Sequence, residues 1–253
     1  MSYSAAPAPP PRQVICTKWG TKFPADDVNT LYRMVRRSLS GELAFWCVTD
    51  DARGLLPDIR PLALPAVPVV GHRNDHGWRK LALFAPDLGG PVGDTLYLDL
   101  DVALTAPLEP FFERPGPFWI IKDYRPLRWR NHYTGNSSVF RYRPENFSAL
   151  YARIEALGAD IMTRYRNEQE FLSDFVRQRG ELQYWPREWC VSFKHDCVRP
   201  LPLGLWSPPH LPQGAKVVVF HGNPKPSDAV AGIGSKWYRP LRPAPWLTQY
   251  LGG

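Results

Sequence analysis

The first fifty residues alternate an apolar run, an amphipathic helical pattern and a second apolar run. The apolar runs occupy residues 14–17 and 43–48. Between them Asp26 or Asp27 offers a helix N-cap, and apolar side chains then recur at helical spacing, at Val28, Leu31, Tyr32, Val35 and Leu39. A strand, a helix and a second strand in this order predict an α/β fold with a parallel sheet.

The remaining sequence extends this pattern toward a mostly parallel central sheet flanked by helices. Apolar runs predict further strands at 59–64, 95–100, 118–122, 137–142 and 217–220. Helical spacing predicts a short helix through Trp78 and Phe84, and longer helices near 147–157 and 169–179. The segment 124–133 is basic and aromatic without any period, so we expect a loop that can act as a lid.

The chain has 253 residues and 44% apolar content, which suits one compact domain. Alanine and proline dominate residues 1–12, and this composition predicts a disordered leader before a domain that spans 13–227. Residues 228–253 are expected to form a basic, aromatic C-terminal tail. That tail would pack on the domain or make at most peripheral contact with a membrane.

Composition and targeting signals favour a cytoplasmic protein with reduced cysteines. The sequence has neither eighteen consecutive apolar residues nor a signal-peptide pattern. The four cysteines lack the paired spacing of a zinc site, so we expect reduced core residues at Cys16, Cys47, Cys190 and Cys197. A net charge of +7 attracts nucleic acid, membrane headgroups and nucleotide diphosphates alike, and does not choose among them.

Two acids follow the most apolar of the predicted strands. Side chains alternate across a strand, so Asp99 and Asp101 should share a face with Tyr97, opposite Leu96, Leu98 and Leu100. Carboxylates at the carboxyl end of a parallel strand lie where α/β sheets bind ligands, and hard oxygen atoms suit magnesium or manganese. Such a metal would neutralise a diphosphate leaving group.

A second motif, His221-Gly222-Asn223-Pro224-Lys225-Pro226, follows the last predicted strand. The imidazole of His221 would emerge at the sheet edge, where it can join an oxygen-rich metal site. Gly222 allows the backbone to approach a phosphate closely. Lys225 would supply a compact positive charge to that phosphate.

In order along the chain, these motifs resemble bacterial glycosyltransferases of the GT-A fold, most nearly glycosyltransferase family eight. The resemblance spans about residues 13–226. The matching segments are Cys16-Thr17-Lys18-Trp19-Gly20, Val28-Asn29-Thr30-Leu31-Tyr32, Val48-Thr49-Asp50-Asp51, Asp99-Leu100-Asp101, Asn136-Ser137-Ser138, Glu168-Gln169 and the His221 to Pro226 motif.

The resemblance implies a single GT-A-like, Rossmann-like domain that binds a nucleotide-diphosphate sugar, with a UDP-sugar favoured. It implies a hexosyltransferase that passes the sugar to a hydroxyl of a glycan, a lipid-linked molecule or another acceptor, with retention of anomeric configuration. Asp99, Asp101 and His221 would bind Mn²⁺ or Mg²⁺, and Lys225 would contact the donor phosphates. No nucleic-acid partner is expected.

The same resemblance implies further donor contacts. Thr17, Lys18, Asp50 and Asp51 would face the nucleotide, and Lys80 would lie near the diphosphate or the sugar. The residues implied for the donor sugar pocket are Asn136, Gln169, Glu168 and Asp123. In two places the chain departs from the family pattern: one glycine directly follows His221, and Glu168 stands where aspartate is usual. If the product proved inverted, Glu168 and Asp123 would be the first acids to test as the base.

Two alternatives remain open on the sequence. The run into Asp99-Leu100-Asp101-Val102 also resembles the nucleophile motif of haloacid-dehalogenase-like phosphatases, in which Asp99 would attack phosphorus. Those enzymes need a later lysine and a downstream acidic pair, whereas the adjacent pair Asp50-Asp51 precedes the strand. A non-enzymatic nucleic-acid or polysaccharide binder would instead use the basic aromatic loop, with Arg125, Arg128, Trp129, Arg130, His132 and Tyr133.

Overall fold

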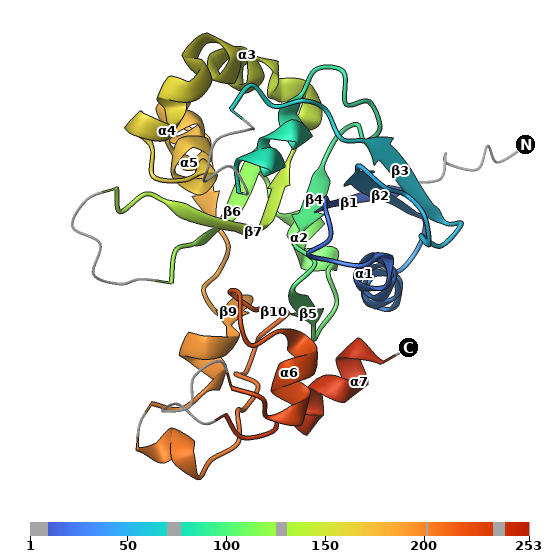
Figure 1. Cartoon of the computed structure of the whole chain (residues 1–253), viewed down its shortest axis with the longest axis vertical. Coiled ribbons are helices and arrows are strands. Elements are labelled where there is room, and N and C mark those ends of the chain that lie inside the picture. The colour runs from blue at the N-terminus through green and yellow to red at the C-terminus, as the bar shows by residue number, and fades with distance from the viewer. Residues whose placement is uncertain (1–9, 70–76, 125–130, 201, 235–240, 253) are drawn as a thin grey trace, which may run out of the picture.

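A seven-stranded sheet forms the body of the computed structural model, which describes residues 10–69, 77–124, 131–200, 202–234 and 241–252 (Figure 1). The strand order is β3-β2-β1-β4-β7-β6-β8, and only β7 runs antiparallel to its neighbours. The strands are β1 (Arg12–Lys18), β2 (Leu43–Thr49), β3 (Ile59–Ala63), β4 (Thr95–Leu98), β6 (Phe118–Lys122), β7 (Gly135–Tyr142) and β8 (Leu182–Tyr184). The predicted α/β fold with a mostly parallel sheet is confirmed.

The opening strand, helix and strand form the predicted parallel unit. β1 and β2 pair in parallel along their whole lengths, with Cys16 opposite Cys47, and α1 (Ala25–Ser38) connects them. β1 begins at Arg12, one residue before the expected start of the domain, because Arg12 still pairs with Leu43. All four cysteines are buried and free, as predicted.

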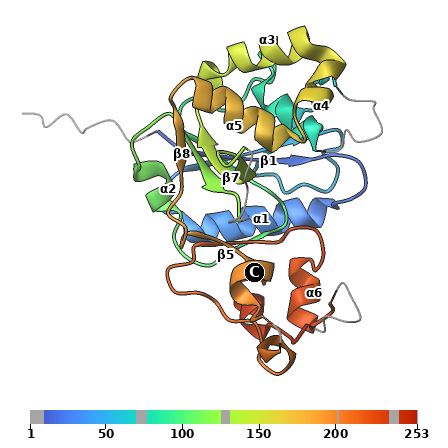
Figure 2. The same cartoon turned by 90° about the vertical axis from the view of Figure 1, so that its left-hand side faces the viewer.

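Helices cover both faces of the large sheet (Figure 2). One face carries α3 (Ser148–Leu157) and α5 (Glu168–Gln178), and the other carries α1. The alternation along β4 explains this division, since Tyr97 packs in the cluster under α3 and α5 whereas Leu96 and Leu98 pack in the cluster over α1. Further helical segments before β8 are η1 (Trp78–Phe84), α2 (Glu109–Glu113), η2 (Pro144–Asn146), η3 (Gly158–Asp160) and α4 (Ile161–Arg164).

A second, three-stranded sheet lies below the large one in Figure 1. β10 (Val217–Val219) pairs antiparallel with β5 (Val102–Leu104) and parallel with β9 (Cys190–Ser192). The expected strand 95–100 therefore ends at Leu98, and a new strand begins after Asp101. The sequence did not predict strands β5, β8 and β9, because three residues are too few to show any periodicity. β10 is as short, but it was predicted because it lies in the continuous apolar run 217–220.

The described part of the segment expected as a tail packs on the rest of the chain. α6 (Pro226–Ala231), η6 (Pro245–Leu247) and α7 (Thr248–Leu251) follow β10, while η4 (Phe193–Cys197) and η5 (Leu203–Leu205) precede it. The guanidinium of Arg37 on α1 donates to the carbonyls of Tyr250 and Gly252, at 2.6 and 2.8 Å. The basic residues Lys236 and Arg239 of this segment lie outside the described residues. No described helix is long and apolar enough to cross a bilayer.

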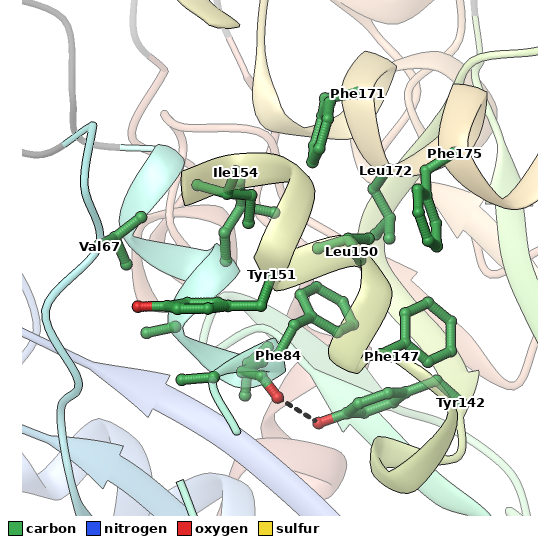
Figure 3. Close-up of a cluster of buried hydrophobic side chains, with 14 of the residues drawn as sticks. Val67, Phe84, Tyr142, Phe147, Leu150, Tyr151, Ile154, Phe171, Leu172 and Phe175 are labelled. Atoms are coloured by element: carbon green, nitrogen blue, oxygen red, sulfur yellow. Dashed lines mark hydrogen bonds between the residues drawn. The ribbon is translucent and has the colours of Figure 1, made fainter. Parts of the chain in front are cut away.

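An aromatic cluster fixes α3 and α5 to the sheet (Figure 3). The ring of Phe147 lies 5.1 Å from that of Phe84 and 6.3 Å from that of Phe175, which joins η1, α3 and α5. The Tyr142 hydroxyl donates to the Leu83 carbonyl at 3.4 Å, drawn as the dashed line in Figure 3. This cluster positions the first turn of α5, which carries Glu168.

Replacing Phe140 with alanine should strongly destabilise the protein. Phe140 is fully buried on β7, and its ring lies 4.7 Å from the ring of Tyr97 and 5.3 Å from that of Tyr142. We expect Phe140→Ala to lower the free energy of unfolding by about 3–5 kcal/mol, because it leaves a cavity in a packed core. Urea denaturation measures this loss. Val92→Ala, at a side chain 72% exposed, is the control and should change stability by less than about 0.5 kcal/mol.

Candidate functional site

A cavity of about 750 Å³ opens at the carboxyl ends of β1, β2 and β4. In parallel α/β sheets this edge is where ligands bind, because the loops leaving the strands gather there. The lining residues are Thr17, Trp19, Gly20, Thr21, Lys22, Phe23, Asp50, Gly77, Arg79, Lys80, Asp99, Leu100, Asp101 and Glu168. Both acids of the D-x-D motif therefore line one cavity, but Leu100, expected on the opposite face, lines it too, because the strand ends at Leu98 and its alternation does not extend through the motif.

A chain of buried hydrogen bonds holds the first of these acids. The hydroxyls of Thr17 and Tyr97 lie 2.8 Å apart, and the Tyr97 hydroxyl donates to Asp99 Oδ1 at 2.7 Å. Lys80 Nζ donates to the same oxygen at 2.8 Å. Two donors on one oxygen fix the orientation of the carboxylate, because rotation would break both hydrogen bonds.

Lys80 links the D-x-D motif to β7 and α5. Besides Asp99, its ammonium group donates to the backbone carbonyl and to the hydroxyl of Ser137, each at 3.1 Å. The Ser137 hydroxyl in turn donates to Glu168 Oε1 at 3.2 Å. An ammonium group has three hydrogens, so these acceptors use all of its donor capacity. Lys80 therefore lines the cavity and also braces its wall.

Glu168 places a buried carboxyl group at the end of this chain. Burial raises the pKa of Glu168, and the nearby charge of Lys80 opposes the shift. Its Oε2 lies only 2.7 Å from the point where a Cβ atom on Gly77 would stand. A side chain at position 77 would therefore displace the carboxyl group. The longer acid in place of the usual aspartate fits because glycine faces it.

Asp101, the second acid of the motif, carries a strongly perturbed carboxyl group. Burial raises the pKa of Asp101 to about 7, the negative charge of Asp99 adds to the rise, and Lys80 and Lys22 oppose it. Two carboxyl groups in one partly desolvated place repel each other when both are ionised. A cation bound between them would relieve this repulsion.

The two sheets meet at Asp101, which brings His221 near the D-x-D motif, although His221 is not among the residues that line the cavity. β5 begins directly after Asp101, β10 ends directly before Phe220, and the Phe220 N–H donates to the Asp101 carbonyl at 3.0 Å. Burial, together with the positive charges of Lys194 and His195, lowers the pKa of His221 to about 4. Its Nε2 atom is buried without a hydrogen-bond partner in the structure, and the ring lies 5.0 Å from that of Tyr124.

This donor set fits a divalent metal in its chemistry. A neutral imidazole with an unpaired buried nitrogen is a ligand for manganese or a related metal, and carboxylate oxygens suit the same ions. In the described ranges, however, no three His, Cys, Asp or Glu side chains already stand close enough together to hold a metal ion.

The nucleotide-facing residues implied by the resemblance divide into two groups. Thr17 and Asp50 line the cavity, and Asp50 Oδ2 accepts the N–H of Gly20 at 2.9 Å. Lys18 and Asp51 are not among the lining residues. Lys18 Nζ donates to the Asp51 carbonyl at 3.2 Å, and the Asp51 carboxylate pairs with Arg53, which holds the pKa of Asp51 well below its usual range.

Four other residues implied for the donor site stand outside the cavity lining. Asn136 Oδ1 accepts the N–H of Ser138 at 2.9 Å within β7. Gln169 is the second residue of α5, and Asp123 follows β6, where its N–H donates to Thr134 at 3.3 Å. Lys225 is the N-cap of α6. Residues 125–130 of the expected lid lie outside the described residues.

Several cavity residues were not identified as site residues from the sequence. They are Trp19, Thr21, Lys22 and Phe23 in the loop after β1, Gly77, and Arg79 beside Lys80. Loops carry no periodic signal, so only their position after a predicted parallel strand indicates the ligand-binding edge. The sequence analysis also did not predict that Tyr97 and Ser137 form the hydrogen bonds that hold Asp99 and Lys80. For Tyr97, its position two residues before Asp99 was the one pattern that could have indicated the contact.

Removing the charge of Lys80 should raise the pKa of the buried Glu168 carboxyl group further. Lys80 is the largest of the effects that lower the pKa of Glu168 against burial, so Lys80→Met leaves burial and the charge of Asp99 opposed only by hydrogen bonds to the carboxyl group. Carboxyl titration by NMR of glutamate-labelled protein measures the change. Lys122→Met is the control. Lys122, on β6, lies over the ring of Tyr184 on β8 and is not among the cavity residues. A pKa of Glu168 that falls or stays unchanged in Lys80→Met contradicts the proposed electrostatic coupling.

Comparison with known proteins identifies the fold. No protein-family model and no curated sequence matches the chain. Among solved structures, the chain is similar to the galactosyltransferase LgtC in complex with donor and acceptor sugar analogs, with a TM-score of 0.65, 14% identity and 95% of each chain covered.

Two further glycosyltransferase structures are similar over most of this chain. GlyE from Streptococcus pneumoniae gives a TM-score of 0.59 and 13% identity over 96% of this chain and 61% of that one. The bifunctional glycosyltransferase WbbM gives 0.58 and 13% over 88% of this chain and 48% of that one. At these identities the likeness establishes the GT-A fold expected from the sequence motifs. The phosphatase alternative is not favoured.

Proposed function

We propose that this protein is a metal-dependent glycosyltransferase that moves a sugar from a nucleotide-diphosphate sugar to an acceptor hydroxyl. The observation that carries the proposal is the D-x-D pair in the wall of the cavity of a GT-A fold. Asp99 is braced by Tyr97 and Lys80, and His221 is brought beside Asp101 by the junction of the two sheets. The edge of the sheet at which this fold binds ligands is thus the edge that carries the two acids.

In the proposed reaction Asp99, Asp101 and His221 hold Mn²⁺ or Mg²⁺. When bound, the metal would neutralise the charge that develops on the departing nucleoside diphosphate. The buried Asp101 carboxyl group, whose pKa is raised by burial and by Asp99, and the buried Nε2 of His221, which has no hydrogen-bond partner, support this assignment. Since the described side chains do not yet stand in a three-ligand cluster, we expect them to adjust when the metal and the donor bind together.

The cavity volume suits a nucleotide sugar, with the donor laid along the carboxyl edge of the sheet. A volume of about 750 Å³ falls in the range of small-molecule sites. We place the nucleoside by Thr17 and Asp50, and the phosphates by the metal and Lys225. The sugar would then lie toward Glu168. Of the bases, uracil is favoured by the resemblance to family eight.

The acceptor, a glycan, a lipid-linked molecule or another hydroxyl compound, would enter beside the sugar and attack the anomeric carbon. Preorganised charges at the diphosphate stabilise the leaving group without reorganisation during the reaction. Glu168 is the buried carboxyl group nearest this end of the cavity in our placement, with its orientation set by Ser137. It would orient the donor sugar by accepting hydrogen bonds from its hydroxyls.

Replacing Asp101 with asparagine should abolish both metal-dependent donor binding and transfer. The asparagine keeps the shape of the side chain and removes the charge that holds the metal. A thermal-shift panel of nucleoside diphosphates and nucleotide sugars, with and without Mn²⁺, measures binding, and sugar release from the stabilising donor measures turnover. Asp58→Asn, at an exposed aspartate, is the matched control and should behave as the wild type. Metal-dependent transfer at the normal rate by Asp101→Asn would show that the metal assignment is wrong.

The stereochemistry of the first product provides an independent prediction. The resemblance to family eight leads us to expect retention of the anomeric configuration of the donor. NMR of the anomeric proton in the new glycosidic linkage, whose configuration is fixed once the bond has formed, measures it directly. An inverted product would reject a retaining mechanism. It would direct attention to Glu168 and Asp123 as acids able to deprotonate the acceptor.

A further inference from the structure

Two lysines from distant parts of the sequence share one aromatic ring at the cavity. Lys22 Nζ lies 5.0 Å from the centre of the Phe23 ring, and Lys225 Nζ lies 5.2 Å from the same centre. Lys22 and Phe23 belong to the loop after β1 and line the cavity. Lys225 caps α6 beyond the second sheet. The ring of Phe23 is thus the meeting point of two cationic segments.

Phe23 is suited to hold these two cations near each other. The negative face of a phenyl ring attracts an ammonium group, and this attraction offsets part of the repulsion between like charges. The ring itself is partly buried against the hydrophobic cluster over α1, so its position is fixed by packing. Neither lysine forms an ion pair with a carboxylate in the described part of the chain, although the charge of Lys225 acts on Asp27 and the charge of Lys22 acts on Asp101.

Each lysine is also directed by its surroundings. The backbone N–H of Lys225 donates to Asp228 Oδ2 at 3.0 Å, which fixes Lys225 as the N-cap of α6. Gly222, at a φ of 71°, turns the chain from His221 toward this cap. Lys22 lies close enough to the D-x-D motif for its charge to act on Asp101. Lys22 and Phe23 therefore line the same cavity as Asp99 and Asp101, and Lys225 contacts Phe23 from outside that lining.

We propose that Lys22 and Lys225, held together by Phe23, form a clamp for the diphosphate group of the donor. Lys22 is then a phosphate-binding residue, and Phe23 is a positioning residue that acts through both lysines. The inference rests on the proposed function and deepens it. The donor capacity of Lys80 is already used by Asp99 and Ser137, so Lys22 is the cavity lysine with hydrogens to offer a phosphate.

The clamp gives the two lysines that share the Phe23 ring a common anionic ligand. A nucleoside diphosphate carries several negative charges, and charge-assisted hydrogen bonds from ammonium groups to phosphate oxygens are among the stronger hydrogen bonds in proteins. Binding of the diphosphate converts the repulsion between Lys22 and Lys225 into attraction to a shared anion. Binding of the donor therefore adds favourable electrostatic energy at both lysines, beyond the attraction that Asp101 and Asp27 already exert on them.

The first test compares the binding of UDP and of inorganic pyrophosphate, with Mg²⁺ present, by isothermal titration calorimetry. We expect Lys22→Met to weaken both ligands about tenfold, because it removes the charge and keeps the length of the side chain. Lys22→Arg should restore most of the affinity. Lys216→Met is the matched control, since Lys216 also lies over an aromatic ring, 5.4 Å from the centre of Trp189, and is not a cavity residue.

The second test isolates the role of Phe23. Phe23→Leu keeps an apolar side chain and removes the π face, so we expect weaker UDP binding, a higher donor KM and a nearly unchanged kcat. Phe23→Tyr should retain wild-type affinity. In the Phe23→Leu background, Lys22→Met should weaken binding less than it does alone, because the two residues act through one clamp.

The outcomes separate this inference from the proposed function. If Lys22→Met binds UDP and pyrophosphate as the wild type does, the clamp is rejected while the sugar-transfer proposal stands. If Phe23→Leu has normal affinity and KM, the positioning role of Phe23 is rejected. If the wild type binds neither ligand and transfers no sugar, the proposed function itself fails. Circular dichroism and thermal unfolding of each variant confirm that any loss of binding occurs in folded protein.

Discussion

The ion pair between Lys80 and Asp99 is the interaction on which the site depends. Its 2.8 Å contact joins η1 to the end of β4, and the remaining hydrogens of the ammonium group reach Ser137 on β7. A buried charge without a partner is strongly destabilising, so neither member can move without the other. The cavity wall from the D-x-D motif to Glu168 therefore behaves as one connected unit.

The junction of the two sheets brings the His221 segment to the D-x-D motif. The main chain leaves the large sheet at Leu98, passes through Asp101 and enters β5 of the small sheet. β10 pairs with β5 and ends beside the motif, which places His221 next to acids more than a hundred residues earlier in the sequence. A short break in a central strand thus creates both the turn that presents the acids and the strand that receives the histidine segment.

Part of the site was accessible from sequence because its information is local. The position of Asp99 and Asp101 directly after a buried strand indicated the ligand-binding edge, and the order of motifs indicated the GT-A fold, which the similarity to LgtC, GlyE and WbbM supports. The bracing of Asp99 by Lys80 and the sharing of Phe23 by Lys22 and Lys225 were not predictable. Those contacts join segments that are far apart in the sequence, and no periodic pattern of residues indicates which distant segments meet.

What the sequence determined alone is the class of fold and the chemistry available at one edge of its sheet. Apolar periodicity specifies strands and helices, and a pair of carboxylates after a buried strand marks the ligand-binding edge of the sheet, because both follow from local geometry. Only the tertiary structure decided which charges are satisfied and which face the cavity. Lys80 is saturated by three acceptors whereas Lys22 is not, and this difference arises from packing between β4, β7, η1 and the loop after β1.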